Sequence, residues 1–326
     1  MNLDSFMPRG LQFGMIRAPL VVLGVVTLTF VLLRVAPGDP VAHLLGPNAT
    51  PAELAAVRSS MGLDRPIGEQ YIRWVGRAVR ADFGTSLATG RPVGRMIWDA
   101  WPATAILVGL SILLSYLIGI AVAAIQATTT RRAVDGFWSG VSIVLAALPG
   151  YWLAFVLIMV FTYALGWLPA FGAAGLDADF LSPGARLADR LNHLILPLAT
   201  LTLIGIGTTA RYTRGTLRAV ATEPYLMLAR AKGAGFWRVL LRHHLRNGLI
   251  PVVTLLGLSL PALFSGAVFV EGVFAWPGIG SVLIQAVQAR DYPVVMAATT
   301  ISAIMVVLGS VAAEVLLHRV DPRARA

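Results

Sequence analysis

Residues 103–127 read ATAILVGLSILLSYLIGIAVAAIQA, a stretch of 25 positions without a charged side chain. A helix needs about 20 mostly apolar residues to cross the hydrocarbon core of a bilayer, so this stretch alone is long enough to span one. Further stretches of the same character occupy residues 18–35, 141–165, 194–210, 249–273 and 294–317. The sequence therefore predicts an all-α membrane protein with six transmembrane helices.

The composition of the whole chain supports this class. Of its 326 residues, 57% are hydrophobic and 13% are charged, and the mean hydropathy is +0.75. Soluble domains carry about 25% charged residues, so a soluble enzyme and a disordered chain are both excluded. The chain has no cysteine, which rules out disulfides, zinc–thiolate sites, iron–sulfur clusters and cysteine nucleophiles.

The distribution of basic residues predicts the orientation of the spans. With the N-terminus inside, 15 arginine and lysine residues fall in inner segments, against three, Arg186, Arg190 and Arg290, in the short outer loops. The segment 36–102 is left out of this comparison, because loops longer than about 60 residues escape the positive-inside rule. We therefore expect both termini to be cytoplasmic. The same count accounts for the net charge of +10 without a nucleic-acid partner.

These spans divide the chain into a simple layout. We expect a cytoplasmic N-terminus, one six-span transmembrane domain and a cytoplasmic tail, over residues 1–17, 18–317 and 318–326. Within the domain, residues 36–102 form a long first outer (periplasmic or extracellular) loop, and residues 211–248 form the longest inner loop.

The long outer segment contains two predicted helices. Pro51 opens one that runs to about Ser60, and Pro66 opens a second. The second helix has one apolar face, formed by Ile67, Tyr71, Trp74, Val75 and Ala78. Two interpretations remain open: an interfacial helix resting on lipid headgroups, or a lip that receives a partner on the outer surface.

The inner loop 211–248 predicts two short helices separated by a glycine break. Thr222 is a candidate N-cap, and the first helix should run to Lys232 and stop at Gly233. A second helix should follow from about residue 236 to 246. On it, arginine recurs at every fourth position, at Arg238, Arg242 and Arg246. Such a hairpin at the inner face of a membrane domain is typical of a docking element.

Catalytic chemistry is absent from the pattern. A nucleotide-binding P-loop requires a lysine after its last glycine, and the chain's one lysine, Lys232, follows Ala231. His243 and His244 are adjacent and so point about 100° apart on a helix, unlike the same-face pair of a metal site. We expect no enzyme activity, no cofactor and no metal site. Any ATP must be hydrolysed by another subunit.

Charged residues within the spans are few. Arg34, Glu271 and Glu314 all lie near predicted span ends, where the simplest interpretation is an interfacial residue that snorkels to the headgroups. An ion-coupled carrier remains an alternative, with Glu271 and Glu314 as its candidate residues. Residues 276–280 (WPGIG) predict a re-entrant or surface hairpin rather than an exposed loop.

Several motifs carry a resemblance to a known family. Residues 229–233 (ARAKG), followed by 242–247 (RHHLRN) and 249–251 (LIP), resemble the cytoplasmic signature loop of ABC-importer permeases, in the variant of the dipeptide/oligopeptide/nickel branch. Met227 stands where the general pattern has glutamate and Arg246 where it has proline, and both departures match the peptide branch. Other matching motifs, in order, are PGDP at 37–40, GLDRP at 62–66, QY at 70–71, FGTS at 83–86, FAWPG at 274–278, RDYP at 290–293 and DPR at 321–323.

This resemblance implies a type I ABC-importer permease fold and a peptide permease B-type subunit in the bacterial plasma membrane. It implies a homologous second permease, two ATPase subunits and an extracytoplasmic substrate-binding protein as partners. It also implies that residues 223–235 form a coupling helix that docks on the ATPase. The residues carried over to that role are Glu223, Ala229, Arg230, Ala231, Lys232, Gly233 and Gly235. A nickel or metal-chelate importer is the alternative, and the substrate-binding residues are unknown.

Overall fold

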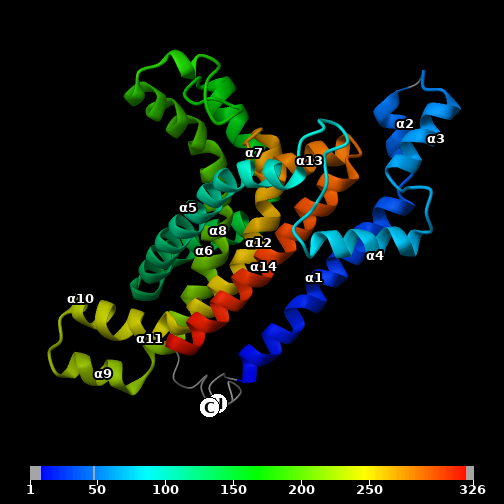
Figure 1. Cartoon of the computed structure of the whole chain (residues 1–326). Helices are drawn as coiled ribbons and strands as arrows, with labels where there is room; N and C mark the ends of the chain where they lie inside the picture. The colour runs from blue at the N-terminus through cyan, green and yellow to red at the C-terminus, as the bar shows by residue number, and fades with distance from the viewer. Residues whose placement is uncertain (1–8, 47, 321–326) are drawn as a thin grey trace. The chain divides into compact units, whose positions relative to one another are not determined.

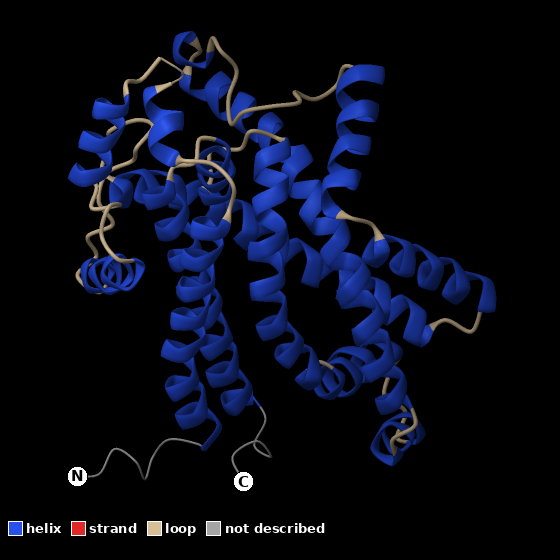
Figure 2. Cartoon of the chain, turned by 90° about the vertical axis from the view of Figure 1, so that its right-hand side faces the viewer, coloured by secondary structure: helices blue, strands red, loops and turns tan. Residues whose placement is uncertain are grey.

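The computed structural model describes residues 9–46 and 48–320, and in this part of the chain the regular structure is helical throughout (Figure 2). An isolated antiparallel bridge between Thr85 and Pro92 is the only β pairing among these residues. The mostly helical class predicted from the sequence is confirmed. Residues 1–8 and 321–326, which include the ends of both predicted cytoplasmic termini and the DPR motif, lie outside the described residues.

The chain forms two compact units. One, the mid-chain unit, is built mainly from Ala105–Trp276, and the other, the two-segment unit, combines Arg17–Thr104 with Pro277–Met305. Figure 1 labels their helices in chain order. The two-segment unit contains most of α1 (Arg9–Val35), α2 (Pro40–Leu45), α3 (Pro51–Ser60), α4 (Ile67–Ala78), the first turns of α5 (Val93–Thr128), α13 (Ile279–Gln288) and most of α14 (Tyr292–Val320).

Short helices α3 and α4 begin where the prolines predicted them. Thr50 caps α3 and accepts the Glu53 N–H at 3.3 Å, while the Glu53 carboxylate accepts the Thr50 N–H at 2.8 Å, which completes a capping box. Pro66 directly precedes α4, which ends at Ala78. The predictions for the 51–60 helix and for the helix after Pro66 are both confirmed.

The apolar face of α4 packs within the chain. Tyr71, Trp74 and Val75 pack on a buried cluster formed by Val26, Phe30 and Met296. The Tyr71 hydroxyl lies 2.6 Å from the Thr27 hydroxyl, and its ring meets Phe30 edge to face at 5.2 Å between centroids. The centre of this apolar face therefore contacts α1, although the sequence predicted that the face would contact lipid headgroups or a partner. The stripe's first residue, Ile67, stays 61% exposed.

Three of the sequence motifs meet inside the two-segment unit. Asp291 of the RDYP motif is 2% exposed, and its carboxylate accepts the Ser86 hydroxyl and the N–H groups of Leu87 and Ala88, at 3.1 and 3.2 Å for the two amides. Arg290 donates to the Pro37 carbonyl of the PGDP motif at 2.6 Å. These motifs are therefore partners in one hydrogen-bond network, although the two contacts join residues 205 and 253 positions apart in the chain.

The mid-chain unit is organised around its longest helix. It contains the rest of α5, α6 (Arg132–Ala147), α7 (Gly150–Leu157), the π-helix η2 (Ile158–Ala164), the 3-10 turn η3 (Ala178–Phe180), α8 (Pro183–Ala221) and α12 (Ile250–Val273). Helix α8 packs against α6, α7 and α12. Glycines permit these contacts: a Cβ added at Gly207 of α8 would lie 2.6 Å from the Ala146 nitrogen and 2.7 Å from the Ser142 carbonyl oxygen of α6.

The predicted span at 141–165 is not a single straight helix. Helix α6 begins at Arg132, and the pair formed by α6 and the helix that follows is bent by 106°. The break falls at Leu148, which has an extended backbone, because Pro149 lacks an N–H and its ring disfavours helical geometry in the residue before it. The stretch predicted as one span at 141–165 is therefore corrected to a bent pair of helices.

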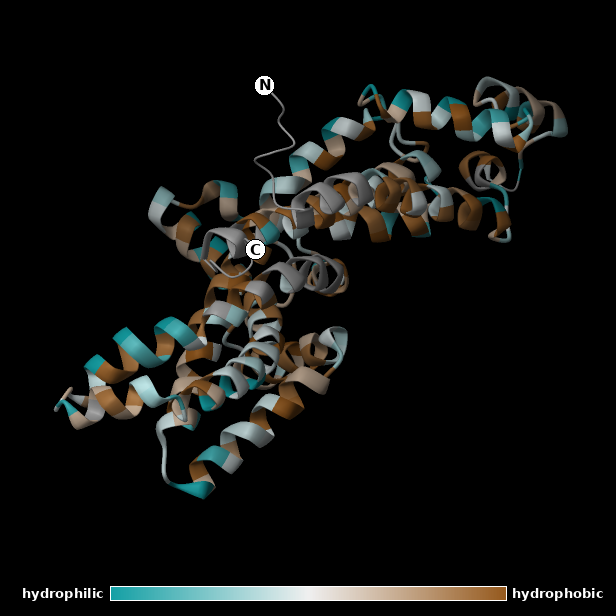
Figure 3. Cartoon of the chain, turned by 90° about the horizontal axis from the view of Figure 1, so that it is seen from below, coloured by the Kyte–Doolittle hydropathy of each residue, from teal (hydrophilic) through white to brown (hydrophobic). Residues whose placement is uncertain are grey.

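Among the described residues, four helices are long and apolar enough to cross a membrane, within α1 (over Ala18–Val35), α5, α8 and α14 (over Tyr292–Ala312), and the bent pair would make a fifth. Helix α12 matches the predicted span 249–273, but several of its side chains lie outside the described set. Apolar residues line the long helices (Figure 3). The count of six spans therefore remains a prediction.

Candidate coupling site

Helix α8 ends where the predicted coupling segment begins. Thr222 is its C-terminal cap, and the Thr222 hydroxyl donates to the Ala219 carbonyl at 3.0 Å. The prediction that Thr222 is the N-cap of the next helix is therefore wrong, because its side chain is committed to the preceding turn. Helix α9 (Pro224–Ala231) instead starts on Pro224, whose missing N–H would have no partner in a first turn.

The end of α9 has the predicted geometry. Gly233 has φ +77, and the Ala234 N–H donates to the Ala229 carbonyl at 3.1 Å. This six-to-one bond around a left-handed residue is the Schellman motif, which favours glycine because other residues are strained there. The chain is thereby turned back sharply after Lys232. The helix stop at Gly233 is confirmed.

The residues expected to contact the ATPase lie on the surface of this turn. Glu223, Ala231, Lys232, Gly233 and Gly235 are exposed, and Ala229 is half-buried. The side chain of Arg230 lies outside the described set. Exposed residues at a sharp turn suit a segment that inserts into a partner. Their role stays a prediction.

A returning arm packs on α9. It consists of α10 (Phe236–Arg238), the π-helix η4 (Val239–Leu245) and α11 (Arg246–Gly248), and Figure 1 shows it running beside α9 as a hairpin. The predicted helix 236–246 is confirmed in extent, with a π-helical middle. The Asn247 amide donates to the Tyr225 hydroxyl at 3.0 Å and so joins the two arms.

The hairpin is fixed to α8 by two contacts at one residue. His244 is 2% exposed, and its Nε2 lies 2.7 Å from the Leu217 carbonyl oxygen. A carbonyl oxygen only accepts, so Nε2 carries the proton. Gly248 packs on the same residue, since a Cβ there would lie 2.5 Å from Leu217 Cδ2. His244 is therefore a structural contact between the hairpin and α8.

Five large apolar side chains of the hairpin are more than half exposed, and sequence reasoning missed them. They are Met227, Leu228, Phe236, Trp237 and Leu241, with exposed fractions between 55% and 68%. One feature of the sequence could have revealed this exposed surface: two aromatic residues directly follow Gly235, at the start of a basic arm. The three arginines of the predicted basic stripe are exposed as well. An apolar and basic surface of this kind is typical of an interaction site.

One of the membrane carboxylates differs from the expectation. Glu271 is 0% exposed in α12, so the interpretation as an interfacial, snorkelling side chain is wrong for it. Glu314 is half-buried. Among the described residues no cluster of three His, Asp or Glu side chains could hold a metal ion.

The segment 276–280 begins with Trp276, which is buried, and so is not an exposed loop.

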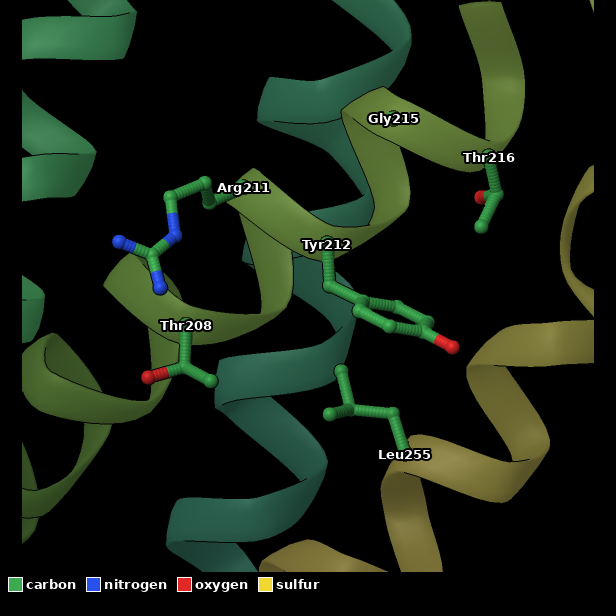
Figure 4. Close-up of a pocket in the computed structure, with 6 residues that line it drawn as sticks. All are labelled: Thr208, Arg211, Tyr212, Gly215, Thr216 and Leu255. Carbon is green, nitrogen blue, oxygen red and sulfur yellow. The ribbon is translucent and has the colours of Figure 1, made fainter. Parts of the chain in front are cut away.

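An open pocket of about 480 Å³ lies on one face of α8 and α12. Figure 4 shows its lining residues, which are Thr208, Arg211, Tyr212, Gly215, Thr216 and Leu255. In that view the Tyr212 ring and Leu255 lie on the same side, and Arg211 points away from them. The pocket presents three hydroxyl groups and one cation. None of these residues was predicted as a site from the sequence.

Comparison with known proteins places these features in context. Residues 115–326 match the family described as "Binding-protein-dependent transport system inner membrane component", and residues 7–108 match the N-terminal model of such components.

Individual relatives match over nearly the whole chain. It is 38% identical over 304 residues to the oligopeptide transport system permease protein AppB of Bacillus subtilis, covering 93% of this chain and 95% of that protein. It is 36% identical over 321 residues to the probable D,D-dipeptide transport system permease protein DdpB of Escherichia coli, covering 93% and 94%. It is 35% identical over 298 residues to the E. coli glutathione transport system permease protein GsiC, covering 91% and 92%.

Proposed function

This chain belongs to the family of binding-protein-dependent transport system inner membrane components, and we propose that it is one of two homologous permease subunits of an ATP-driven peptide importer. Members of this family are transport permeases and not catalytic subunits. The chain is therefore a multi-pass membrane permease subunit, and the hydrolysis of ATP belongs to partner subunits.

The observation that carries this proposal is the anchored hairpin between α8 and α12. Its tip, the predicted coupling residues around Gly233, is exposed, while its base is held to α8 through His244 and Leu217. A docking element needs this combination, because an exposed tip can enter a partner and a fixed base transmits the partner's movement. We infer that residues 223–235 dock on the ATPase, with Glu223, Arg230 and Lys232 as its charged contacts.

Peptides are the favoured substrates. The relatives described above are named for the transport of oligopeptides, D,D-dipeptides and glutathione, all of which contain peptide bonds. A nickel or metal-chelate importer is not favoured by any of these names. The separate binding protein, captured on the outer side, would select which peptide reaches this chain.

The mechanism follows from a change in packing between two states. ATP binding closes the two ATPases, the docked hairpins of both permeases approach each other, and the helix bundles move between inward-open and outward-open arrangements. The ATPase supplies the free energy that separates these arrangements. In this topology the chain has six spans in a bacterial plasma membrane, with both termini and residues 211–248 in the cytoplasm and residues 36–102 outside.

The test is a site-specific crosslink within the assembled complex. The chain has no cysteine, so Ala231→Cys or Lys232→Cys introduces a single attachment point for a maleimide photo-crosslinker. Both positions are exposed at the hairpin tip, and Ser60→Cys, exposed on α3, is the matched control. Affinity purification in mild detergent follows, with mass spectrometry of the products.

We expect an adduct with an ATPase from positions 231 and 232 and none from position 60. A second permease and a binding protein should copurify, and the ligand carried by that binding protein should be a peptide. A chain that purifies alone from membranes containing its natural partners would contradict the proposal and favour the ion-coupled carrier.

A further inference from the structure

An ion cluster joins α6 to α8 just above the hairpin. The Arg214 guanidinium binds the Asp135 carboxylate in bidentate fashion, with Nε to Oδ1 and Nη2 to Oδ2 both at 2.8 Å. Arg218 contributes a third contact, Nη2 to Oδ2, at 2.9 Å. The side chains of Asp135 and Arg214 are 20% and 26% exposed. Bidentate, partly buried pairs of this kind are stronger and geometrically more specific than exposed surface pairs.

The cluster also reaches α5. Gln126 of α5 is 1% exposed, and its amide nitrogen donates to the Ser139 hydroxyl at 3.0 Å and to the Asp135 carbonyl at 3.3 Å. Asp135 lies in the first turn of α6, where a negative charge also interacts favourably with the helix dipole. Asp135 of α6 therefore contacts both α8, through its carboxylate, and α5, through its backbone carbonyl.

The same turn of α8 carries the hairpin's anchor. Leu217 lies between Arg214 and Arg218 in the chain and is 0% exposed. Its carbonyl accepts from His244, and its side chain contacts Gly248. A continuous path of hydrogen bonds and packing thus runs from the hairpin through one turn of α8 to the start of α6 and the end of α5.

We propose that Asp135, Arg214 and Arg218 form a positioning joint that makes the α9–α11 hairpin move as one body with α5, α6 and α8, so that movement of the ATPase is converted into movement of the helices. This role rests on the proposed docking of the hairpin. Loss of the carboxylate leaves two arginines without their counter-ion, and these long side chains can turn to water or headgroups. The helices then remain folded while their connection loosens.

The test uses the complete transporter with its binding protein, reconstituted in liposomes that supply ATP on the ATPase side. The readout is the amount of peptide taken up for each ATP hydrolysed. Asp135→Asn is compared with Asp99→Asn, a matched control that removes the carboxylate of an exposed pair with Arg91 in the other unit. A second variant, Arg218→Gln, keeps the bidentate pair and therefore the strongest fold contact.

We expect Asp135→Asn to copurify with the ATPase and to hydrolyse ATP, while uptake per ATP falls about fivefold or more, the range of ordinary coupling energies. Arg218→Gln should cause a smaller fall, and Asp99→Asn none. The exchange Asp135→Arg with Arg214→Asp should recover part of the loss, because it rebuilds the pair with the charges reversed.

Three outcomes would overturn the proposal. If Asp135→Asn takes up as much peptide per ATP as the wild type, the ion cluster does not transmit ATPase movement to the helices. A proportional loss of hydrolysis and uptake would indicate a purely structural role, as would the absence of recovery in the charge exchange. If the unaltered chain itself does not bind the ATPase, the proposed function fails, and that result is visible before any variant is made.

Discussion

Single residues explain why widely separated motifs occur together in this sequence. The buried Asp291 carboxylate receives donors from the loop after α4, and Arg290 next to it reaches the turn after α1. Gly38 in that turn has φ +109, a conformation that other residues rarely adopt, and the Arg290 guanidinium packs directly against it. Three motifs that resemble sequence signatures are therefore parts of one structural contact.

Asp291→Asn should destabilise the protein strongly. The amide places an N–H₂ group where a carboxylate oxygen now accepts, so that at least one buried donor of Ser86, Leu87 or Ala88 loses its partner. The expected cost is about 1–3 kcal/mol, measured as a lower midpoint in thermal unfolding of the purified protein. Asp64→Asn, at an exposed position, is the control. Equal midpoints for the two variants would contradict this account of the network.

Asp82 makes a local contribution that depends on pH. A hydrogen bond from Arg77, and then one from the Gly84 N–H, lower the pKa of the Asp82 carboxyl below its ordinary value of about 3.9. A carboxyl whose pKa is lower in the folded state stabilises that state above the unfolded pKa, and this stabilisation is lost as the pH falls through the folded pKa.

Hydrogen exchange of residues 79–92 tests this contribution. Relative to the intrinsic rate, protection of this segment should decrease as the pH is lowered below about 4, and the decrease should be absent in Asp82→Asn. Because both side chains of the pair are exposed, the effect should stay confined to this segment. A loss of protection of the same size in the variant would assign it to another group.

At the scale of elements, α6 and α8 depend on a close approach at Gly207. Gly207→Ala should destabilise the protein by about 1–3 kcal/mol, because the added methyl group meets backbone atoms that cannot rotate away. Gly215→Ala on the same helix meets nothing within 4 Å and should be neutral or slightly stabilising, as alanine favours the helix. Thermal unfolding in one detergent compares the two. An equal effect of both substitutions would mean that the helices are not in contact at residue 207.

Helix boundaries that depend on a nearby proline or glycine were predicted from the sequence, whereas features that depend on tertiary contacts were not. The starts of α3 and α4 and the end of α9 follow from Pro51, Pro66 and Gly233, whose backbone preferences act within a few residues. The bend after α6 needed a choice between an ordinary proline kink and a real break at Pro149. Hydropathy alone does not make that choice, because both sides of the break are apolar.

The candidate coupling site, residues 223–235 with the returning arm, also combines predictable and unpredictable features. The hairpin and its glycine stop were predictable, while its exposed aromatic residues and its anchor on Leu217 were not. His244 illustrates the reason, since adjacent histidines reveal nothing about the carbonyl that one of them meets 27 residues earlier. The burial of Glu271 is another such case, because its surroundings are assembled from the packed helices and not from its neighbours in sequence.

For the whole molecule, the absence of cysteine permits a direct test of topology. Single substitutions Ser60→Cys, Leu176→Cys and Met227→Cys place a thiol at exposed positions in three different loops. With six spans and an inner N-terminus, a membrane-impermeant maleimide should label positions 60 and 176 in intact cells. Position 227 should react only after the membrane is opened.

Position 176 is the decisive one. If the bent pair α6–α7 enters and leaves the membrane on the same side, residue 176 lies on the inner side and is protected in intact cells. Because α8 would cross the membrane between the two positions, the same arrangement carries residue 227 to the outer side, and its labelling in intact cells would overturn the cytoplasmic assignment of the hairpin. Both results are independent of transport activity.

The length of α8 has a mechanical consequence. Its 39 residues extend about 58 Å, almost twice the thickness of a bilayer's hydrocarbon core. Pro197 removes one internal hydrogen bond of the helix, and about 36 Å of helix separate it from the end that holds the hairpin. A bend at Pro197 is therefore amplified along the helix: a tilt of about 5° at this residue displaces the far end by about 3 Å. In the proposed transporter, a movement of a few ångströms at an ATPase therefore needs only a small rotation of this one helix.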